Sequence, residues 1–191
     1  MKIMRIRSTI ARPADNTAYT AGDEISNHAT AGSVVRPTFH LSGFNRGRIR
    51  GAEIDITAAS GNVVTTAGDF ELLIFRTDDV PAAVGDNVTH PIAAADRAKA
   101  IASFRFDDTG WTGPLGTVAV GASQVQAVMP TLVQPLATNV VLHAPFYPGH
   151  PFDFTGQNTK TFTAVLRALA AWTPTSVINT FGITLDIEAE A

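Results

Sequence analysis

The sequence predicts an all-β fold, a jelly-roll-like β-sandwich of roughly 8–10 strands with one short helix. Short apolar segments recur along the chain, and many of them alternate apolar with polar residues, as strands do because successive side chains face opposite sides of a sheet. The 15 glycines and 11 prolines are scattered between these segments, where turns are needed. Long connections over 11–33 and 78–99 suit a jelly roll better than an up-and-down barrel.

The predicted strands follow from this alternation and from the turn residues between them. They are 2–10, 34–41, 47–58, 69–77, 100–107, 115–120, 123–129, 138–146, 161–172 and 180–189. The last strand has the clearest pattern, with apolar residues at the odd positions 183–189 and polar residues at the even positions 184–190.

The strand over 47–58 changes parity within its length. Arg46, Arg48 and Arg50 occupy even positions, yet the later even positions hold the apolar Ile54 and Ile56. One extra residue in a strand moves every later side chain to the other face. We therefore predict a β-bulge at Gly51.

Two segments favour a helix by composition. Residues 93–100 are predicted to form a turn or two of helix, capped by an upstream polar residue. Residues 162–172 are rich in alanine and leucine, which are good helix formers. Their apolar residues nevertheless alternate at even positions and Thr-Pro follows, so we predict a strand there.

Composition limits the classes of function. The 191 residues suit one domain over 1–191, with an N-terminal strand or arm over about 1–33. A net charge of −3 gives no electrostatic case for a nucleic-acid partner, and zero cysteines exclude disulfides and thiolate chemistry. The sequence has neither an apolar stretch of the roughly 18 residues that a membrane span needs nor a signal peptide. We expect a protein made in a cytoplasm, without a membrane partner.

Candidate catalytic and metal-binding residues form only weak patterns. His143, His150 and Asp153 are the nearest approach to a metal set, but their spacing is not that of a cupin or zinc protease. The acids of Asp78–Asp79, Asp86 and Asp107–Asp108 are interpreted as turn residues. No phosphate-binding loop or nucleophile elbow is present in the sequence. We predict no enzyme, no metal and no cofactor.

Exposed aromatic residues could instead stack on sugars, which leaves a carbohydrate-binding domain as an alternative. The aromatic side chains available for such stacking are Trp111, Phe146, Tyr147, Phe152, Phe154 and Trp172.

Charges at the two ends of the chain have opposite signs. Lys2, Arg5 and Arg7 begin it, and three acids at 186, 188 and 190 end it. If the terminal strands pair, these charges face each other across the ladder. Alternatively, this basic end or the row Arg46, Arg48 and Arg50 contacts an acidic partner surface or another subunit. In the connection 12–25, Tyr19 is predicted to anchor the loop on the sandwich.

Several stretches resemble a family of small structural proteins of tailed bacteriophages. They are "TIARPADNTAYTAGDEI" (9–25), "FELLIFRTDDVPAAVGDN" (70–87), "AAADRAKAIASFRF" (93–106) and "LRALAAWTPTSVINTFGITLDIE" (166–188). The positions that follow the family pattern are Arg12-Pro13, Tyr19, Gly22-Asp23, Phe75, Pro81, Asp86-Asn87 and Asp96. The match covers most of the chain in order, but each motif is short and none is catalytic.

This resemblance implies a virion structural protein, above all a capsid decoration or cement protein. Such proteins are β-rich and bind the major capsid protein on the outer surface of the head as oligomers. The resemblance therefore implies a location on the virion surface and homo-oligomers, with trimers favoured for a capsid lattice. The His- and Pro-rich segment 143–151 departs from the family pattern, so contacts are not transferred to it.

Overall fold

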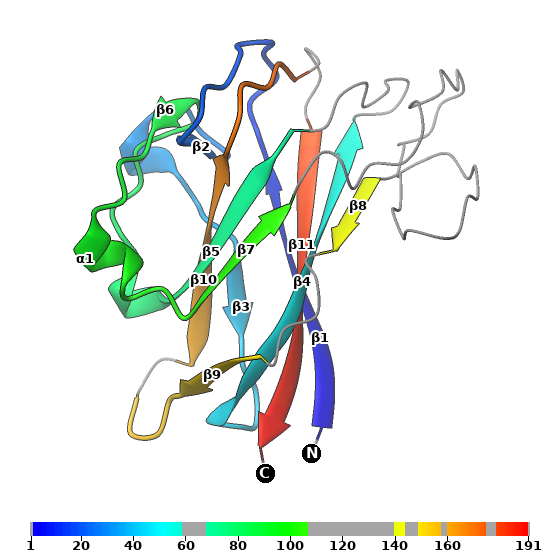
Figure 1. Cartoon of the computed structure of the whole chain (residues 1–191), viewed down its shortest axis with the longest axis vertical. Helices are drawn as coiled ribbons and strands as arrows, with labels where there is room; N and C mark the ends of the chain where they lie inside the picture. Colours follow the sequence, from blue (N-terminus) through cyan, green and yellow to red (C-terminus); the bar gives the residue numbers. More distant parts are fainter. Residues whose placement is uncertain are drawn as a thin grey trace.

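The computed structural model describes residues 2–58, 68–106, 140–143, 149–157, 160–174 and 179–190. These residues form two antiparallel sheets that face each other, which confirms the all-β sandwich (Figure 1). The first sheet contains β1 (Lys2–Ala11), β4 (Arg46–Ala58), β8 (Val140–His143), β9 (His150–Asp153) and β11 (Asn179–Glu190). The second contains β2 (Asp23–Ile25), β3 (Thr38–His40), β5 (Phe70–Arg76), β6 (Val88–Thr89), β7 (Ala102–Phe106) and β10 (Thr161–Ala168).

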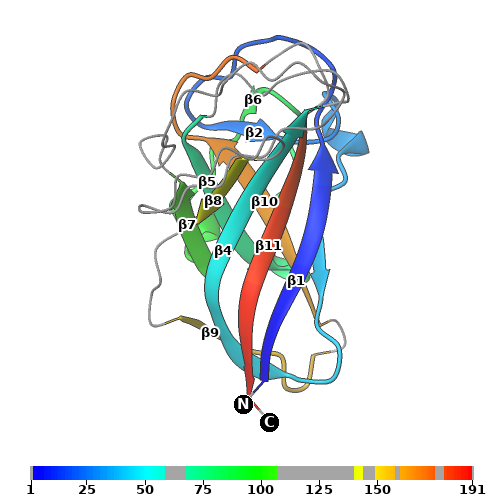
Figure 2. The same ribbon diagram turned by 90° about the vertical axis from the view of Figure 1, so that its right-hand side faces the viewer.

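The strand pairs are nested along the chain. β1 pairs with β11, β2 and β3 pair with β10, β4 pairs with β8 and β9, and β5 pairs with β7. The first sheet has the order β1-β11-β4-β8 and the second the order β2-β10-β5-β7, with β6 beyond β2. A hairpin folded upon itself in this way is a jelly roll. Figure 2 shows the first sheet face-on, with the two ends of the chain side by side.

The bulge predicted at Gly51 in β4 is confirmed, although the extra residue is the preceding one. Ile49 pairs with Ile187 and Gly51 pairs with Asp186, so Arg50 is the extra residue on its strand. Before the bulge the odd position Ile49 is buried, and after it the even positions Ile54 and Ile56 are buried. The bulge thus keeps one apolar face toward the second sheet along the whole strand.

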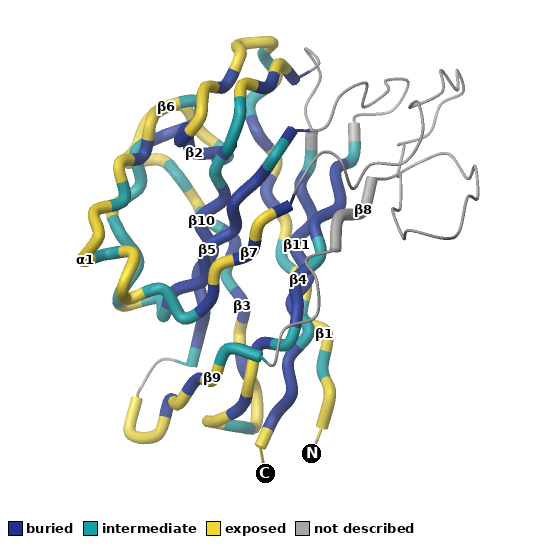
Figure 3. Tube along the Cα trace, in the orientation of Figure 1, coloured by how far each residue is buried: buried dark blue, intermediate teal, exposed yellow. Residues whose placement is uncertain are grey.

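The main hydrophobic core lies between the sheets, where Figure 3 shows the buried stretches facing each other. The even-numbered apolar residues of β10 point into it, which confirms a strand over 161–168 despite its helix-forming composition. The predicted residues 169–172 lie beyond the end of this strand. Hydrogen bonding to β5 along one edge and to β2 and β3 along the other outweighs that intrinsic preference. Three aromatic rings, Phe70, Trp172 and Phe181, pack edge to face at one end of this core.

A second, smaller core lies on the outer face of the second sheet. Leu73, Phe75 and Val165 point outward there and are covered by Val80 and Ile92 from the connection between β5 and β7. This connection contains the 3-10 turn η2 (Thr77–Asp79) and the helix α1 (Ala94–Arg97). The predicted polar cap of the helix is wrong, because Ala93 occupies the N-cap and makes no side-chain hydrogen bond.

The short strands were the least predictable elements. β2, β6 and β9 were not predicted, and the strand expected over 34–41 is only Thr38–His40, preceded by the 3-10 turn η1 (Ala31–Ser33). The strand expected over 138–146 is described as β8 (Val140–His143). The strands predicted over 115–120 and 123–129 lie outside the described residues.

Candidate functional site

Two of the three predicted basic residues of β1, Arg5 and Arg7, lie on the outer face of the first sheet. Arg5 pairs with Asp186 of β11 at 3.0 Å and with Glu53 of β4 at 2.6 Å, and Arg7 pairs with Asp55 of β4 at 2.6 Å. The expected pairing of charges across the β1–β11 ladder is therefore confirmed for Arg5 and Asp186. Both arginines also reach across β11 to β4, so the ion pairs connect three strands.

A glycine makes room for one of these bridges. A Cβ atom on Gly182 of β11 would lie 2.2 Å from both the Arg7 guanidinium and the Asp55 carboxylate. Only the bare backbone of glycine lets these two side chains meet above the middle strand. Burial raises the pKa of Asp55, and this effect exceeds the opposing effect of Arg7. The surroundings of this carboxylate therefore disfavour its ionised form.

The predicted row on β4 is arranged differently. Arg46 pairs with Asp153 of β9 at 2.9 Å, and Arg50 pairs with Glu188 of β11. Arg48 and Lys2 are exposed. The row is therefore divided. Arg50 lies over the first sheet, whereas Arg46 and Arg48 lie at the start of β4, which is the lower end of the sandwich in Figure 1. A contact of these cations with a capsid or another subunit stays a prediction.

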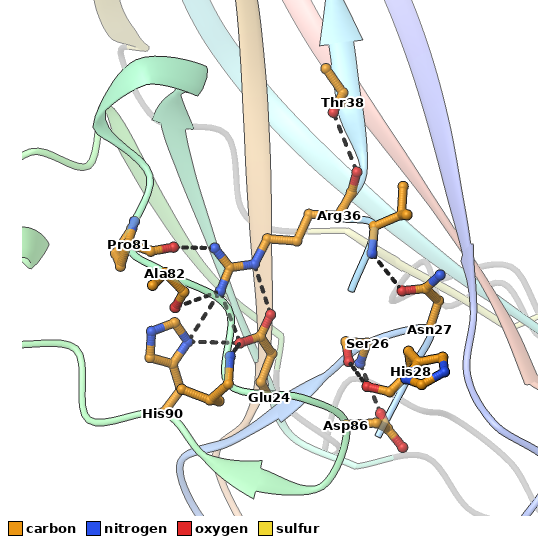
Figure 4. A network of polar contacts seen from close by, with 12 residues as sticks. Glu24, Ser26, Asn27, His28, Arg36, Thr38, Pro81, Ala82, Asp86 and His90 are labelled. Atoms are coloured by element: carbon orange, nitrogen blue, oxygen red, sulfur yellow. Dashed lines mark hydrogen bonds and ion pairs between the residues drawn. The ribbon is translucent and has the colours of Figure 1, made fainter. Parts of the chain in front are cut away.

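A buried ion-pair cluster not predicted from the sequence lies beside β2 (Figure 4). Glu24 is 1% exposed, and its two carboxylate oxygens accept from Arg36 at 2.7 and 2.9 Å. His90 Nδ1 lies 2.9 Å from Glu24 Oε2. Burial alone would raise the pKa of Glu24, but hydrogen bonds from His90 and Arg36 outweigh it and lower that pKa.

Arg36 extends this cluster to the connection that follows β5. Its guanidinium also donates to the carbonyl oxygens of Pro81 and Ala82. One side chain therefore joins the segment before β3, the strand β2 and the segment after η2. The cluster fixes two long connections against the same end of the second sheet.

Tyr19 lies in a second buried cluster. It is completely buried and stacks on Trp172, with ring centroids 5.3 Å apart. Its hydroxyl donates to Asp86 at 2.7 Å and accepts from Arg12 at 2.9 Å. Asp86 also accepts from the backbone N–H of Ser26 at 2.8 Å, while its Oδ2 atom has no hydrogen-bond partner among the described residues.

Desolvation dominates the electrostatics of this cluster. Burial raises the pKa of Asp86, although hydrogen bonds from Ser26 and Tyr19 act in the opposite direction. Burial also raises the pKa of Tyr19, and the Asp86 charge adds to that effect. Asp86 was interpreted from the sequence as a turn residue, and it does lie in a turn before β6. The sequence did not predict that its side chain binds Tyr19, which lies 67 positions earlier in the chain.

A third ion-pair cluster attaches α1 to the second sheet. Glu71 of β5 is 1% exposed and accepts from Arg97 of α1 at 2.6 and 3.0 Å. Arg167 of β10 lies 3.5 Å from the same carboxylate. Burial would raise the pKa of Glu71, but the arginines outweigh it and lower that pKa.

The clusters of Glu24 and Glu71 share one sequence property, which explains why they were not predicted. Each joins a strand residue to residues far away in the chain, as Glu24 joins His90 and Glu71 joins Arg97. A buried charge at a strand position departs from the alternation of apolar and polar residues, and that departure was the available signal. All three clusters hold loops in place, and the buried carboxylates of Glu24 and Glu71 are each matched by an arginine.

The candidate metal set is not brought together. His143 pairs with Glu53 on β4, while Asp153 pairs with Arg46, seven positions away on the same strand. At about 3.3 Å per residue, Glu53 and Arg46 lie roughly 20 Å apart along β4, which also separates the backbones of their partners His143 and Asp153. His150 packs edge-on against Phe104. No group of three metal-ligating side chains occurs within the ranges that the structure describes.

The candidate sugar-stacking aromatics fall into two groups. Phe152, Phe154 and Trp172 are at most 6% exposed, so none of them presents an open ring face on which a sugar could stack. Trp111, Phe146 and Tyr147 lie outside the described residues.

Comparisons with known proteins give little further information. No family model and no curated protein matches the sequence. A chain from the single-particle structure of maize chlorotic mottle virus is similar over 100% of this chain and 96% of that chain, at 10% identity and a TM-score of 0.25. A chain of Desmodium yellow mottle tymovirus is similar over 100% and 90%, at 11% identity and a TM-score of 0.23. TM-scores this low carry no argument about function. None of the helices in the described part of the chain is long and apolar enough to cross a membrane.

Proposed function

We propose that this protein is a non-enzymatic virion structural protein that binds the outside of a phage capsid lattice and stabilises it as a decoration or cement protein. The observation that carries the proposal is the nested strand order of the jelly roll. This architecture recurs in viral capsid domains. Fold alone does not define function, and the ordered sequence resemblance described above supplies the second argument.

The internal ion pairs support a role in binding. The connections between β1 and β3 and between β5 and β7 are held by Arg36, Glu24 and Arg97. A loop that is already ordered loses little conformational entropy when a partner binds. Many copies on one lattice would then add modest individual contacts into a stable coat.

The proposed partners are the major capsid protein and further copies of this chain. We propose a homo-oligomer, with a trimer favoured because closed rotational symmetry suits sites on a capsid lattice. The proposed location is the surface of the virion, after synthesis in the host cytoplasm. Light scattering on the purified protein tests the oligomer, and a mass equal to one chain at every concentration would contradict it.

Heads made with and without the protein test the function itself. Phage heads purified from a deletion strain should release DNA at a lower temperature than complete heads, and adding the purified protein should restore the difference. The protein should also sediment with intact heads and appear on their outer surface in a reconstruction. A protein absent from intact heads, or heads equally stable without it, would overturn the proposal.

Jelly rolls also occur in lectin domains, so a glycan-binding domain of a phage tail or fibre is the second candidate. Burial of Phe152 and Phe154 removes two of its proposed stacking residues. The candidate then depends on Trp111, Phe146 and Tyr147. Loss of binding to a glycan array in Tyr147→Ala, with head stability unchanged, would favour it over the capsid role.

A further inference from the structure

We propose that the lower end of the sandwich, next to both chain ends, is a binding site for an acidic peptide segment of a partner protein. Two adjoining cavities of about 460 and 680 Å³ lie there and share Arg46 and Glu190 in their walls. Lys2 lines the larger cavity, and Arg48 and Arg76 line the smaller one. The inference concerns the chemistry of the partner and does not depend on the partner being a capsid.

The charge of this end differs from that of the whole chain. Four cationic side chains, Lys2, Arg46, Arg48 and Arg76, line the two cavities together with two carboxylates, Asp153 and Glu190. This leaves an excess of two positive charges, although the chain as a whole carries a net charge of −3. An acidic ligand is therefore attracted to this end in particular.

Two of the arginines are fixed in position from opposite sheets. Arg46 begins β4 and binds the Asp153 carboxylate at 2.9 Å. Arg76 ends β5, donates to the Asp153 carbonyl oxygen at 2.9 Å and lies over the Phe154 ring at 5.5 Å. Within the described residues, Arg76 has no carboxylate at ion-pair distance. Its planar guanidinium is thus held ready to bind a carboxylate through two parallel hydrogen bonds.

The extent of the site favours a peptide over a small anion. Its cations come from β1, β4 and β5, and Phe44 and Phe152 add apolar surface to the cavity walls. A single phosphate could reach only part of this set, whereas an extended segment with several carboxylates could reach all of it. Nucleic acids require neutralisation of many phosphates, and an excess of two charges is small for that purpose.

The test is binding of a fluorescently labelled hexaglutamate peptide to the full chain, followed by anisotropy at low salt. We expect saturable binding that weakens as salt is added. Arg46→Gln and Arg76→Gln should each lower the affinity about tenfold, because each removes one charge-assisted contact. Lys99→Gln is the matched control, since Lys99 is 51% exposed and Arg46 58% exposed; its affinity should equal that of the parent protein.

Each other outcome would overturn the assignment. Absence of saturable binding, or equal affinity in all variants with unchanged melting temperatures, would remove the site. Displacement of the peptide by inorganic phosphate at the same concentration would make it a small-anion site. Tighter binding of an oligothymidylate of equal length would make it a nucleic-acid site. Because the probe is a peptide, failure here is distinct from failure of the head-stability experiment.

Discussion

Glu24 shows how this protein holds a charge inside the fold. Its carboxylate is almost fully buried, and Arg36, 7% exposed at its side chain, is buried with it. A buried pair of this kind contributes little compared with a well-packed apolar pair, but removing one member leaves the other charge buried without compensation. The pair therefore matters most for keeping two loops in one arrangement.

Replacing Glu24 by glutamine should destabilise the protein by about 3 kcal/mol, because Arg36 then keeps its charge in a buried site without a carboxylate. Urea denaturation of Glu24→Gln measures the change in the free energy of unfolding. Asp96→Asn is the control, since Asp96 pairs with the exposed Lys99; its midpoint should not move. Equal midpoints for both variants would show that the buried pair is not required.

The contribution of Asp86 to stability should change with pH in the opposite direction from that of Glu24. Because burial raises the pKa of Asp86 above its ordinary value of 3.8, folding favours the protonated form. The contribution of Asp86 to stability is therefore present below that value and is lost as pH rises through the raised pKa.

The variant Asp86→Asn stays neutral, so its stability relative to the parent protein should increase from about pH 4 to pH 8. Urea denaturation at a series of pH values measures this difference. A difference that is constant with pH would contradict the burial effect.

At the scale of single elements, the ion pairs above β11 depend on a residue without a side chain. In Gly182→Ala the new Cβ atom displaces the ends of the Arg7 and Asp55 side chains. Loss of this partly exposed ion pair should lower stability by about 1 kcal/mol.

Gly51→Ala is the matched control for this substitution, because its nearest contact would be Asp186 at an ordinary 3.6 Å. Gly51→Ala should cause no loss of stability. Thermal unfolding of the two variants compares them, and an unperturbed Gly182→Ala would mean that Arg7 and Asp55 do not meet above the strand.

The elements differ in how far the sequence predicts them. β11 was predicted because apolar and polar residues alternate along it. The β4 bulge was predicted because the arginines 46, 48 and 50 and the apolar Ile54 and Ile56 all occupy even positions. β2 was not, since Asp23 and Glu24 are buried together with Ile25 and the strand has no alternation. β9 contains Pro151 and follows a proline-rich segment, and prolines argue against a strand when only the sequence is known. The partners of Glu24 and Glu71 depend on tertiary contacts, which no local pattern contains.

At the scale of the whole molecule, stability should fall in acid. Hydrogen bonds and ion pairs lower the pKa of both Glu24 and Glu71 below the ordinary value of 4.5. Their contribution is therefore present above pH 4.5 and is lost as pH falls through the lowered values.

Melting temperatures between pH 7 and pH 3 measure this loss. The double variant Glu24→Gln/Glu71→Gln should be less stable at pH 7 but should lose less on acidification than the parent protein. Parallel curves for the two proteins would contradict a role for these carboxylates in acid unfolding.

The nested strand order also determines when the protein can fold. β1 pairs only with β11 among the described strands, so β1 cannot pair until the long segment between these two strands has been synthesised. Pairing between such distant segments is slow, and an unpaired strand edge can associate with other chains during that interval. Charged residues on an open strand oppose such association. We therefore expect Arg5 and Arg7, which bridge three strands in the folded protein, to oppose association of β1 with other chains before β4 and β11 are synthesised.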